Sequence, residues 1–357
     1  MVQGKSTFQL EQINYRGYNK MSNRGKVIKL NANENFYGCA PEVLNSINHK
    51  ITNVNLYPQH SGRLEEILAE KFSVSPQNIV TGGGSVRVID GIVQTFVEPD
   101  EEIIIFDRSF VAYQQVAKSH RRKVHLAKQN NFVCDVNNIF PLISNKTKVI
   151  FIANPNNPTG TIISNSELEL LLCEISPEIL VVIDEAYFEY VTDTTFPDSL
   201  SLQRKYPNVV IVRTFSKIYG LAGLRIGYAV LEESLSERMK QNRIPFFFNL
   251  ISEQAAIIAL KYENFIQECK EQNNIERNYL YSSLKDSGFN VIESQANFLY
   301  LSFDDEQEKD LIFEKLLDRE ILICNLKIFG QDKSLRITIG NREANNKIIE
   351  CLEAHNS

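Results

Sequence analysis

Apolar, β-branched runs alternate with amphipathic stretches over the first two thirds of the chain, and this alternation predicts strands and helices in turn. Strands are predicted at residues 102–107, 122–127, 148–153, 179–184 and 208–214. Helical spacing of apolar residues predicts helices at 41–50, 62–72, 110–119 and 165–174. The strand runs are apolar on both faces, which is typical of a mainly parallel sheet that helices cover on both sides. The pattern therefore predicts a three-layer α/β domain.

The pattern changes after residue 245. A long helical stretch at 251–286 is followed by strands predicted at 298–303 and 335–339, and by helices predicted at 306–318 and 342–354. This order predicts a smaller α+β domain at the C-terminus. We expect an N-terminal arm of residues 1–28, a large domain of residues 29–245 and a small domain of residues 246–357.

Composition narrows the class of protein. The 357 residues are 43% hydrophobic and 23% charged, as in an ordinary globular enzyme. A net charge of −6 argues against nucleic-acid and anionic-membrane partners, which require a basic face. Six scattered cysteines and an N-terminus without an apolar signal segment predict free thiols and a cytoplasmic location. The five histidines form no H-E-x-x-H motif, so no metal site is predicted.

Candidate chemistry is densest at residues 214–228, directly after a predicted strand. This segment holds Ser216, Lys217 and Arg225 among three glycines, and glycine lets a backbone approach a ligand closely. A desolvated lysine amine beside a cationic group can attack a carbonyl, while a hydroxyl and a guanidinium bind phosphate. Together they predict a lysine that forms a Schiff base with a phosphorylated aldehyde, pyridoxal phosphate (PLP). A solvated surface lysine is the alternative interpretation.

Other candidates also follow predicted strands, at the edge of a parallel sheet where ligands bind. Asp184 ends an apolar run, and a buried aspartate can pair with the protonated ring nitrogen of PLP. Asn157, in a turn between two prolines, and Tyr187 could hydrogen-bond the 3′ oxygen of the cofactor, and Phe110 could stack on its ring. Taken singly, these residues could equally be a turn, a helix cap or core packing.

In this order the segments resemble fold-type-I PLP enzymes of the class I/II aminotransferases, and most closely the histidinol-phosphate aminotransferase group. The resemblance covers nearly the whole chain. It runs through Tyr15, Asn31–Asn35, Tyr57-Pro58, the glycine-rich turn at 82–84, Asn154–Gly160, Asp184–Tyr187, Ser216-Lys217, Arg225 and Leu335–Gly340.

The resemblance implies a role for each residue around the cofactor. Lys217 would carry PLP and act as general acid and base, and Asp184 would hold the ring nitrogen. Asn157 and Tyr187 would bind the 3′ oxygen, and Phe110 would lie against the ring. Contacts to the cofactor's phosphate would come from Ser85, the Val86 amide, Ser216, Arg225 and, from the neighbouring subunit, Tyr57.

The resemblance also implies the substrate contacts and the assembly. Arg336 would bind a carboxylate or phosphate of the substrate together with Asn157, and Tyr15 would lie near the mouth of the pocket. Because Tyr57 would act in the neighbouring subunit's site, we expect a homodimer with shared active sites.

The preferred reaction is transfer of an amino group from histidinol phosphate to 2-oxoglutarate. Three positions depart from the resemblance: Phe36 replaces a usual proline, Phe110 a frequent tyrosine, and Cys324 an arginine that is common in the histidinol-phosphate enzymes. An aromatic or other amino donor therefore stays open, as does a decarboxylase of the threonine-phosphate type. A PLP-sensing regulator would need a DNA-binding module, which the short N-terminal arm cannot contain.

Overall fold

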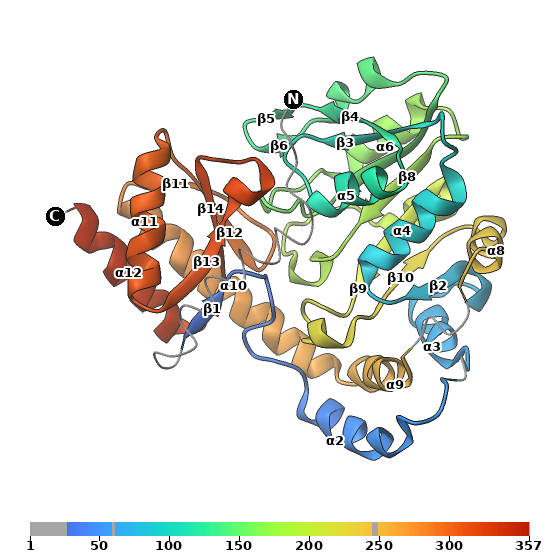
Figure 1. Cartoon of the computed structure of the whole chain (residues 1–357), viewed down its shortest axis with the longest axis horizontal. Helices are drawn as coiled ribbons and strands as arrows, with labels where there is room; N and C mark the ends of the chain where they lie inside the picture. Colours follow the sequence, from blue (N-terminus) through green and yellow to red (C-terminus); the bar gives the residue numbers. More distant parts are fainter. Residues whose placement is uncertain (1–26, 59–60, 245–248, 357) are drawn as a thin grey trace.

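The computed structural model describes residues 27–58, 61–244 and 249–356. In this part of the chain seven strands form the larger sheet (Figure 1). Their order is β2 (Ile79–Gly82), β10 (Gly227–Val230), β9 (Val209–Thr214), β8 (Leu180–Asp184), β7 (Thr147–Ala153), β3 (Glu102–Phe106) and β4 (Lys123–Ala127). Strand β10 is antiparallel to both neighbours, and every other pairing in the sheet is parallel. The predicted three-layer α/β fold is confirmed.

Helices cover both faces of this sheet because successive strand residues point to opposite sides. In β8, Val181 and Ile183 belong to one buried cluster, while Leu180 and Val182 belong to the other. The first cluster is covered by α3 (Arg63–Phe72), α6 (Asn165–Glu174), α7 (Ser199–Lys205) and α9 (Leu250–Ala259). The second is covered by α4 (Ser85–Phe96), α5 (Val111–Ser119) and α8 (Glu233–Gln241).

Five strands of the described residues form a second sheet. Their order is β1 (Ile28–Leu30), β13 (Ile321–Asn325), β14 (Ser334–Thr338), β12 (Phe298–Ser302) and β11 (Asn290–Ile292). Helices α10 (Glu263–Asp286), α11 (Glu306–Asp318) and α12 (Arg342–Asn356) pack on it around a separate apolar cluster. Figure 1 shows α10 running from α9 to the smaller sheet, where it contacts β11 and β12, and its Cys269 belongs to the first buried cluster of the larger domain.

Two details were not predicted from the sequence. Residues 29 and 30, at the start of the predicted large domain, lie in β1 and pair in parallel with β13 of the smaller sheet. The helical stretch predicted at 251–286 consists of two helices, because α9 packs on the larger core while α10 crosses to the smaller sheet. The domain boundaries at 28 and 245 stay predictions.

The described part of the chain contains no helix with the length and apolarity that a membrane crossing requires. The same residues contain no cluster of three or more histidine, cysteine or acidic side chains that could hold a metal ion. All six cysteines are free thiols.

Candidate active site

A pocket of about 200 Å³ opens where the carboxyl ends of β7, β8 and β9 meet the smaller sheet. Parallel strands place their carboxyl ends along one edge, which explains why residues far apart in sequence meet here. Ten of the twelve residues predicted for the site line this pocket. They are Ser85, Val86, Phe110, Asn157, Asp184, Tyr187, Ser216, Lys217, Arg225 and Arg336.

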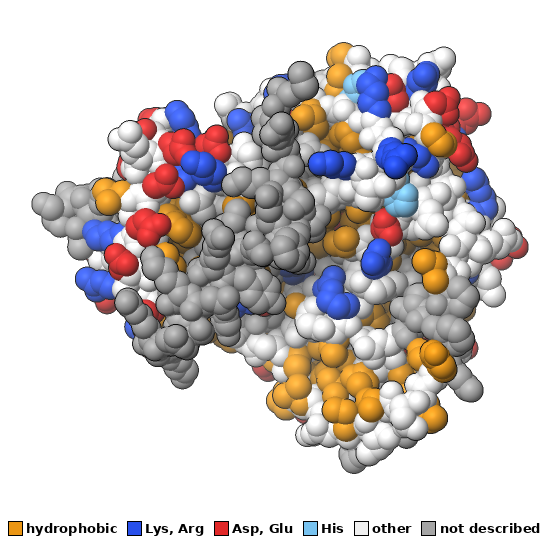
Figure 2. All heavy atoms as spheres, viewed as in Figure 1, with side chains coloured by type: hydrophobic (Ala, Val, Ile, Leu, Met, Phe, Trp, Pro, Cys, Tyr) orange, Lys and Arg blue, Asp and Glu red, His pale blue; other side chains and the backbone are white. Residues whose placement is uncertain are grey.

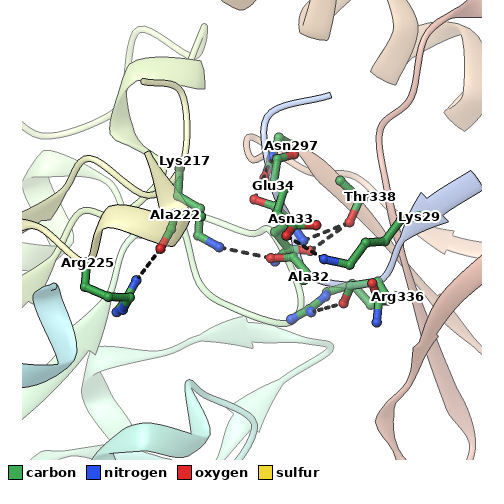
Figure 3. A network of polar contacts seen from close by, with 11 residues as sticks. Lys29, Ala32, Asn33, Glu34, Lys217, Ala222, Arg225, Asn297, Arg336 and Thr338 are labelled. Carbon is green, nitrogen blue, oxygen red and sulfur yellow. Dashed lines mark hydrogen bonds and ion pairs between the residues drawn. The ribbon is translucent and has the colours of Figure 1, made fainter. Parts of the chain in front are cut away.

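Lys217 lies in the loop after β9, and its half-buried side chain points into the pocket. Its Nζ donates a hydrogen bond to the carbonyl oxygen of Ala32 at 3.2 Å and lies 5.3 Å from the ring centre of Tyr187. Figure 3 shows this contact between the large-domain loop and the segment that follows β1. Among the described residues this carbonyl is the only hydrogen-bond partner of the amine, which faces the pocket.

Asp184 is the last residue of β8 and is 3% exposed. One carboxylate oxygen accepts a hydrogen bond from the Tyr113 hydroxyl at 2.8 Å, and the other accepts one from the Ala186 amide at 3.2 Å. Burial raises the pKa of Asp184 to about 6, although both hydrogen bonds act in the opposite direction. A carboxylate in this position would be stabilised by a cation placed in the pocket.

A cradle of donors lies at the start of α4. Helix α4 begins without a side-chain cap, so the N–H groups of Ser85 and Val86 face the pocket region as potential donors to an anion. Arg225 has a positive φ of 53° and donates to the Ser216 hydroxyl at 3.2 Å. Two amides, two hydroxyls and a guanidinium therefore surround one end of the pocket.

Two glycines allow this close packing. A Cβ on Gly84 would lie 2.3 Å from the guanidinium of Arg225, and a Cβ on Gly227 would lie 2.5 Å from the Ser85 nitrogen. Neither contact is compatible with a larger residue in this backbone arrangement. Glycine is therefore required where β10 and Arg225 approach the start of α4.

At the opposite side, Arg336 projects from β14 and is 7% exposed. It donates to the side-chain oxygen of Asn157 at 2.5 Å and to the carbonyl of Asn31 at 3.0 Å. Its Nε is buried and has no hydrogen-bond partner among the described residues. A buried donor without a partner is costly, so this atom favours binding of an anionic ligand group.

The remaining predictions have different outcomes. Phe110 lies in the pocket wall and packs edge-on against Tyr113. Tyr57 is 77% exposed and does not line the pocket of its own chain. Tyr15 lies outside the described residues.

Two further residues support the site and were not predicted. Asn33 donates to the Tyr187 hydroxyl at 3.0 Å, and its backbone N–H bonds to Thr338. Tyr113 donates to Asp184 from α5. The three asparagines at 31–35 were a possible signal for Asn33, whereas Tyr113 has only the spacing of a core residue.

Comparison with known proteins identifies the family. The family described as Aminotransferase class I and II matches residues 25–352, nearly the whole chain. The chain belongs to this family. A histidinol-phosphate aminotransferase of Anaeromyxobacter sp. is 39% identical, over 91% of this chain and 90% of the relative. The corresponding relative from Moorella thermoacetica is 36% identical, over 91% and 84%.

Solved structures show the same fold as this aminotransferase. The histidinol-phosphate aminotransferase of Sinorhizobium meliloti, crystallised with pyridoxal-5′-phosphate, superposes with a TM-score of 0.87. It is 23% identical, and the match covers 96% of this chain and 94% of that structure. The chain is therefore an enzyme of the aminotransferase family, and its pocket lies between the two sheets of that fold.

Proposed function

We propose that this enzyme is a PLP-dependent aminotransferase that moves an amino group from histidinol phosphate to 2-oxoglutarate. The observation that carries the proposal is the arrangement of Lys217, Asp184 and the α4 start around one pocket. The curated relatives at 36% and 39% identity are named for histidinol phosphate, which supports that donor over an aromatic one.

The donors in the pocket fit PLP in chemistry. The amides at the start of α4, with Ser216 and Arg225, suit a phosphate group. The buried Asp184 carboxylate suits a protonated ring nitrogen, and Tyr187 and Asn157 offer polar groups for a ring oxygen. When bound, PLP supplies an electron sink that stabilises negative charge at the α-carbon of the substrate.

Each of the pocket residues would have its own role in the reaction. Lys217 would hold the cofactor through its amine, and the same amine would move the proton at the α-carbon of the substrate. Asp184 would keep the ring nitrogen protonated through its charge, and Phe110 would lie against the ring. Arg336, fixed by Asn157, orients the substrate through an anionic group.

We propose a homodimer in which Tyr57 acts in the partner's site. Figure 2 shows hydrophobic side chains gathered over α2 (Pro41–Lys50), at the bottom of the view. The exposed apolar residues of α2 and the segment after it are Leu44, Ile51, Val54, Leu56 and Tyr57. Exposed apolar side chains gathered in this way support burial against a second copy. With free thiols and a net charge of −6, the proposal places the dimer in the cytoplasm without nucleic-acid or membrane partners.

The test is to incubate the purified enzyme with PLP, 2-oxoglutarate and a panel of amino donors that includes histidinol phosphate. We expect glutamate to form fastest with histidinol phosphate and not at all with Lys217→Ala. Lys285→Ala is the matched control, because Lys285 also lies over a tyrosine ring but on α10, outside the pocket. Release of carbon dioxide without glutamate would contradict transamination, and a faster aromatic donor would reassign the substrate.

A further inference from the structure

The substrate end of the pocket lacks the arginine that the resemblance leads one to expect on β13. Cys324 holds that position, is 2% exposed and packs with Tyr300 and Leu326 instead of lining the pocket. A thiol supplies no bidentate contact to a phosphate or carboxylate. If the substrate carries a second anionic group, another cation must meet it.

Arg108 does not itself line the pocket, but it directly precedes Ser109 and Phe110, which line its wall. Two side-chain amides, of Gln129 and Asn156, each donate to the Arg108 carbonyl at 2.8 Å and so fix its backbone. The side chain therefore starts from a defined point beside the pocket.

The Arg108 guanidinium is held on an aromatic platform. Its central carbon lies 5.4 Å from the ring centre of Phe132, which in turn lies 5.3 Å from the ring of Tyr300. Phe132 is in the turn between β5 (Gln129–Asn130) and β6 (Val133–Cys134), and the Thr161 hydroxyl donates to its carbonyl. Stacking of this kind leaves the edge N–H groups of an arginine available to an anion.

The platform joins Arg108 to the pocket wall. The Tyr300 hydroxyl donates to Gln331, a residue that lines the pocket together with Phe329. Burial raises the pKa of Tyr300, and the Ser334 hydrogen bond and the positive charge of Arg108 act in the opposite direction. Phe132 and Phe329 pack on the one small cluster that contains Cys324, so the aromatic platform under Arg108 reaches the position of the missing arginine.

Among the described residues, no acid neutralises the charge of Arg108. Within residues 27–58, 61–244 and 249–356, no acidic side chain forms an ion pair with Arg108, and the adjacent Asp107 pairs with Lys128 at 3.2 Å. The guanidinium is half-buried, where an anion gains more from a cation than it would in bulk water.

We propose that Arg108 is a specificity-determining residue that binds the anionic group at the distal end of the substrate. Arg336 then holds the end of the pocket near Asn157, and Arg108 holds the end beyond Gln331. The assignment rests on the proposed function, in which that distal group is the phosphate of histidinol phosphate. Arg108 replaces, from the β3–α5 loop, the contact that Cys324 cannot make from β13.

The test compares kcat/KM for histidinol phosphate and for histidinol in the PLP-loaded enzyme. Arg108→Ala should lower the ratio of the two values by about 10- to 100-fold, mainly through KM for the phosphate ester. The ratio for Arg108→Lys should lie between those of the wild type and Arg108→Ala, because an ammonium keeps the charge but cannot make the bidentate contact of a guanidinium. Arg238→Ala is the matched control: Arg238 stacks on Phe96 from α8, remote from the pocket, and its removal should leave the ratio unchanged.

An equal loss for both donors would assign Arg108 a structural role, and an unchanged ratio would remove it from the site; either result overturns the inference. If the wild-type enzyme uses neither donor, the proposed substrate is wrong and inorganic phosphate becomes the probe. Phosphate inhibition against whichever donor the panel identifies should then weaken about tenfold in Arg108→Ala. Unchanged inhibition would overturn the inference.

Discussion

Asp184→Asn should make the cofactor-free enzyme more stable at neutral and alkaline pH while making it a poorer catalyst. Asp184 is buried, and desolvation raises its pKa from 3.8 to about 6. Above pH 6 the carboxylate is charged in both the folded and the unfolded chain, and the folded chain carries the cost of burying that charge. The difference between the two pKa values corresponds to about 3 kcal/mol of unfolding free energy.

The stability difference between the wild type and Asp184→Asn should depend on pH. Well below pH 3.8 the carboxyl is protonated in both states, so the two proteins should have nearly equal stability. The wild type then loses stability as the pH rises from about 4 to about 6 and levels off above that, whereas the amide of the variant stays neutral. An asparagine at this position can still accept the hydrogen bond from Tyr113. Bound PLP would place a cation against the wild-type carboxylate, so the wild type should gain more stability from the cofactor than the variant.

The assay is urea unfolding of both cofactor-free proteins between pH 4 and pH 8. We expect the variant to exceed the wild type by about 3 kcal/mol at pH 8, with the excess vanishing toward pH 4. Asp198→Asn is the control of opposite sign, because the Ser201 hydroxyl lowers the pKa of Asp198 at the start of α7. That variant should be less stable at neutral pH. A constant or absent excess for Asp184→Asn would refute the reasoning.

Three further predictions test the cradle, the dimer and the β13 position. Gly227→Ala should weaken PLP affinity at least tenfold, because the added Cβ would lie 2.5 Å from the Ser85 nitrogen at the start of α4. If fluorescence titration gives the variant the same affinity as the wild type, the two backbones are not in contact. Lys217→Ala and Tyr57→Ala should each be inactive alone. When the two variants are refolded together in equal amounts, about a quarter of all sites should carry neither defect and regain activity. Activity at the parental average, with mixed dimers shown to form, would place Tyr57 in its own chain's site. Cys324→Arg should lower the unfolding free energy by about 2–4 kcal/mol, because it buries a second guanidinium opposite Arg336. An unchanged melting temperature would show instead that position 324 opens toward the substrate.

The sequence predicted the large-domain part of the site well because that part follows local rules. Asp184 ends an apolar run that forms a parallel strand, Lys217 and Asn157 follow two others, and such strands end along one edge. The apolar runs themselves are long and are bounded by turn residues, so their positions could be read without knowledge of distant contacts.

Features that depend on distant pairing could not be predicted. β10 is four residues long and pairs with β2, whose sequence lies about 150 residues away; nothing local distinguishes it from the glycine-containing loop around it. Asn33 meets Thr338 only because β1 joins the C-terminal sheet. Tyr113 looks like a core residue until its hydroxyl is placed against Asp184.

The central claim is that Lys217 carries the cofactor, and borohydride reduction of the PLP-loaded enzyme tests it most directly. Reduction should fix one cofactor per chain, and peptide mapping by mass spectrometry should locate it on the peptide that contains Lys217. Lys217→Ala should remain folded and retain no cofactor after the same treatment and denaturation. Cofactor fixed to any other lysine of the wild type, or retained by the variant, would contradict the account.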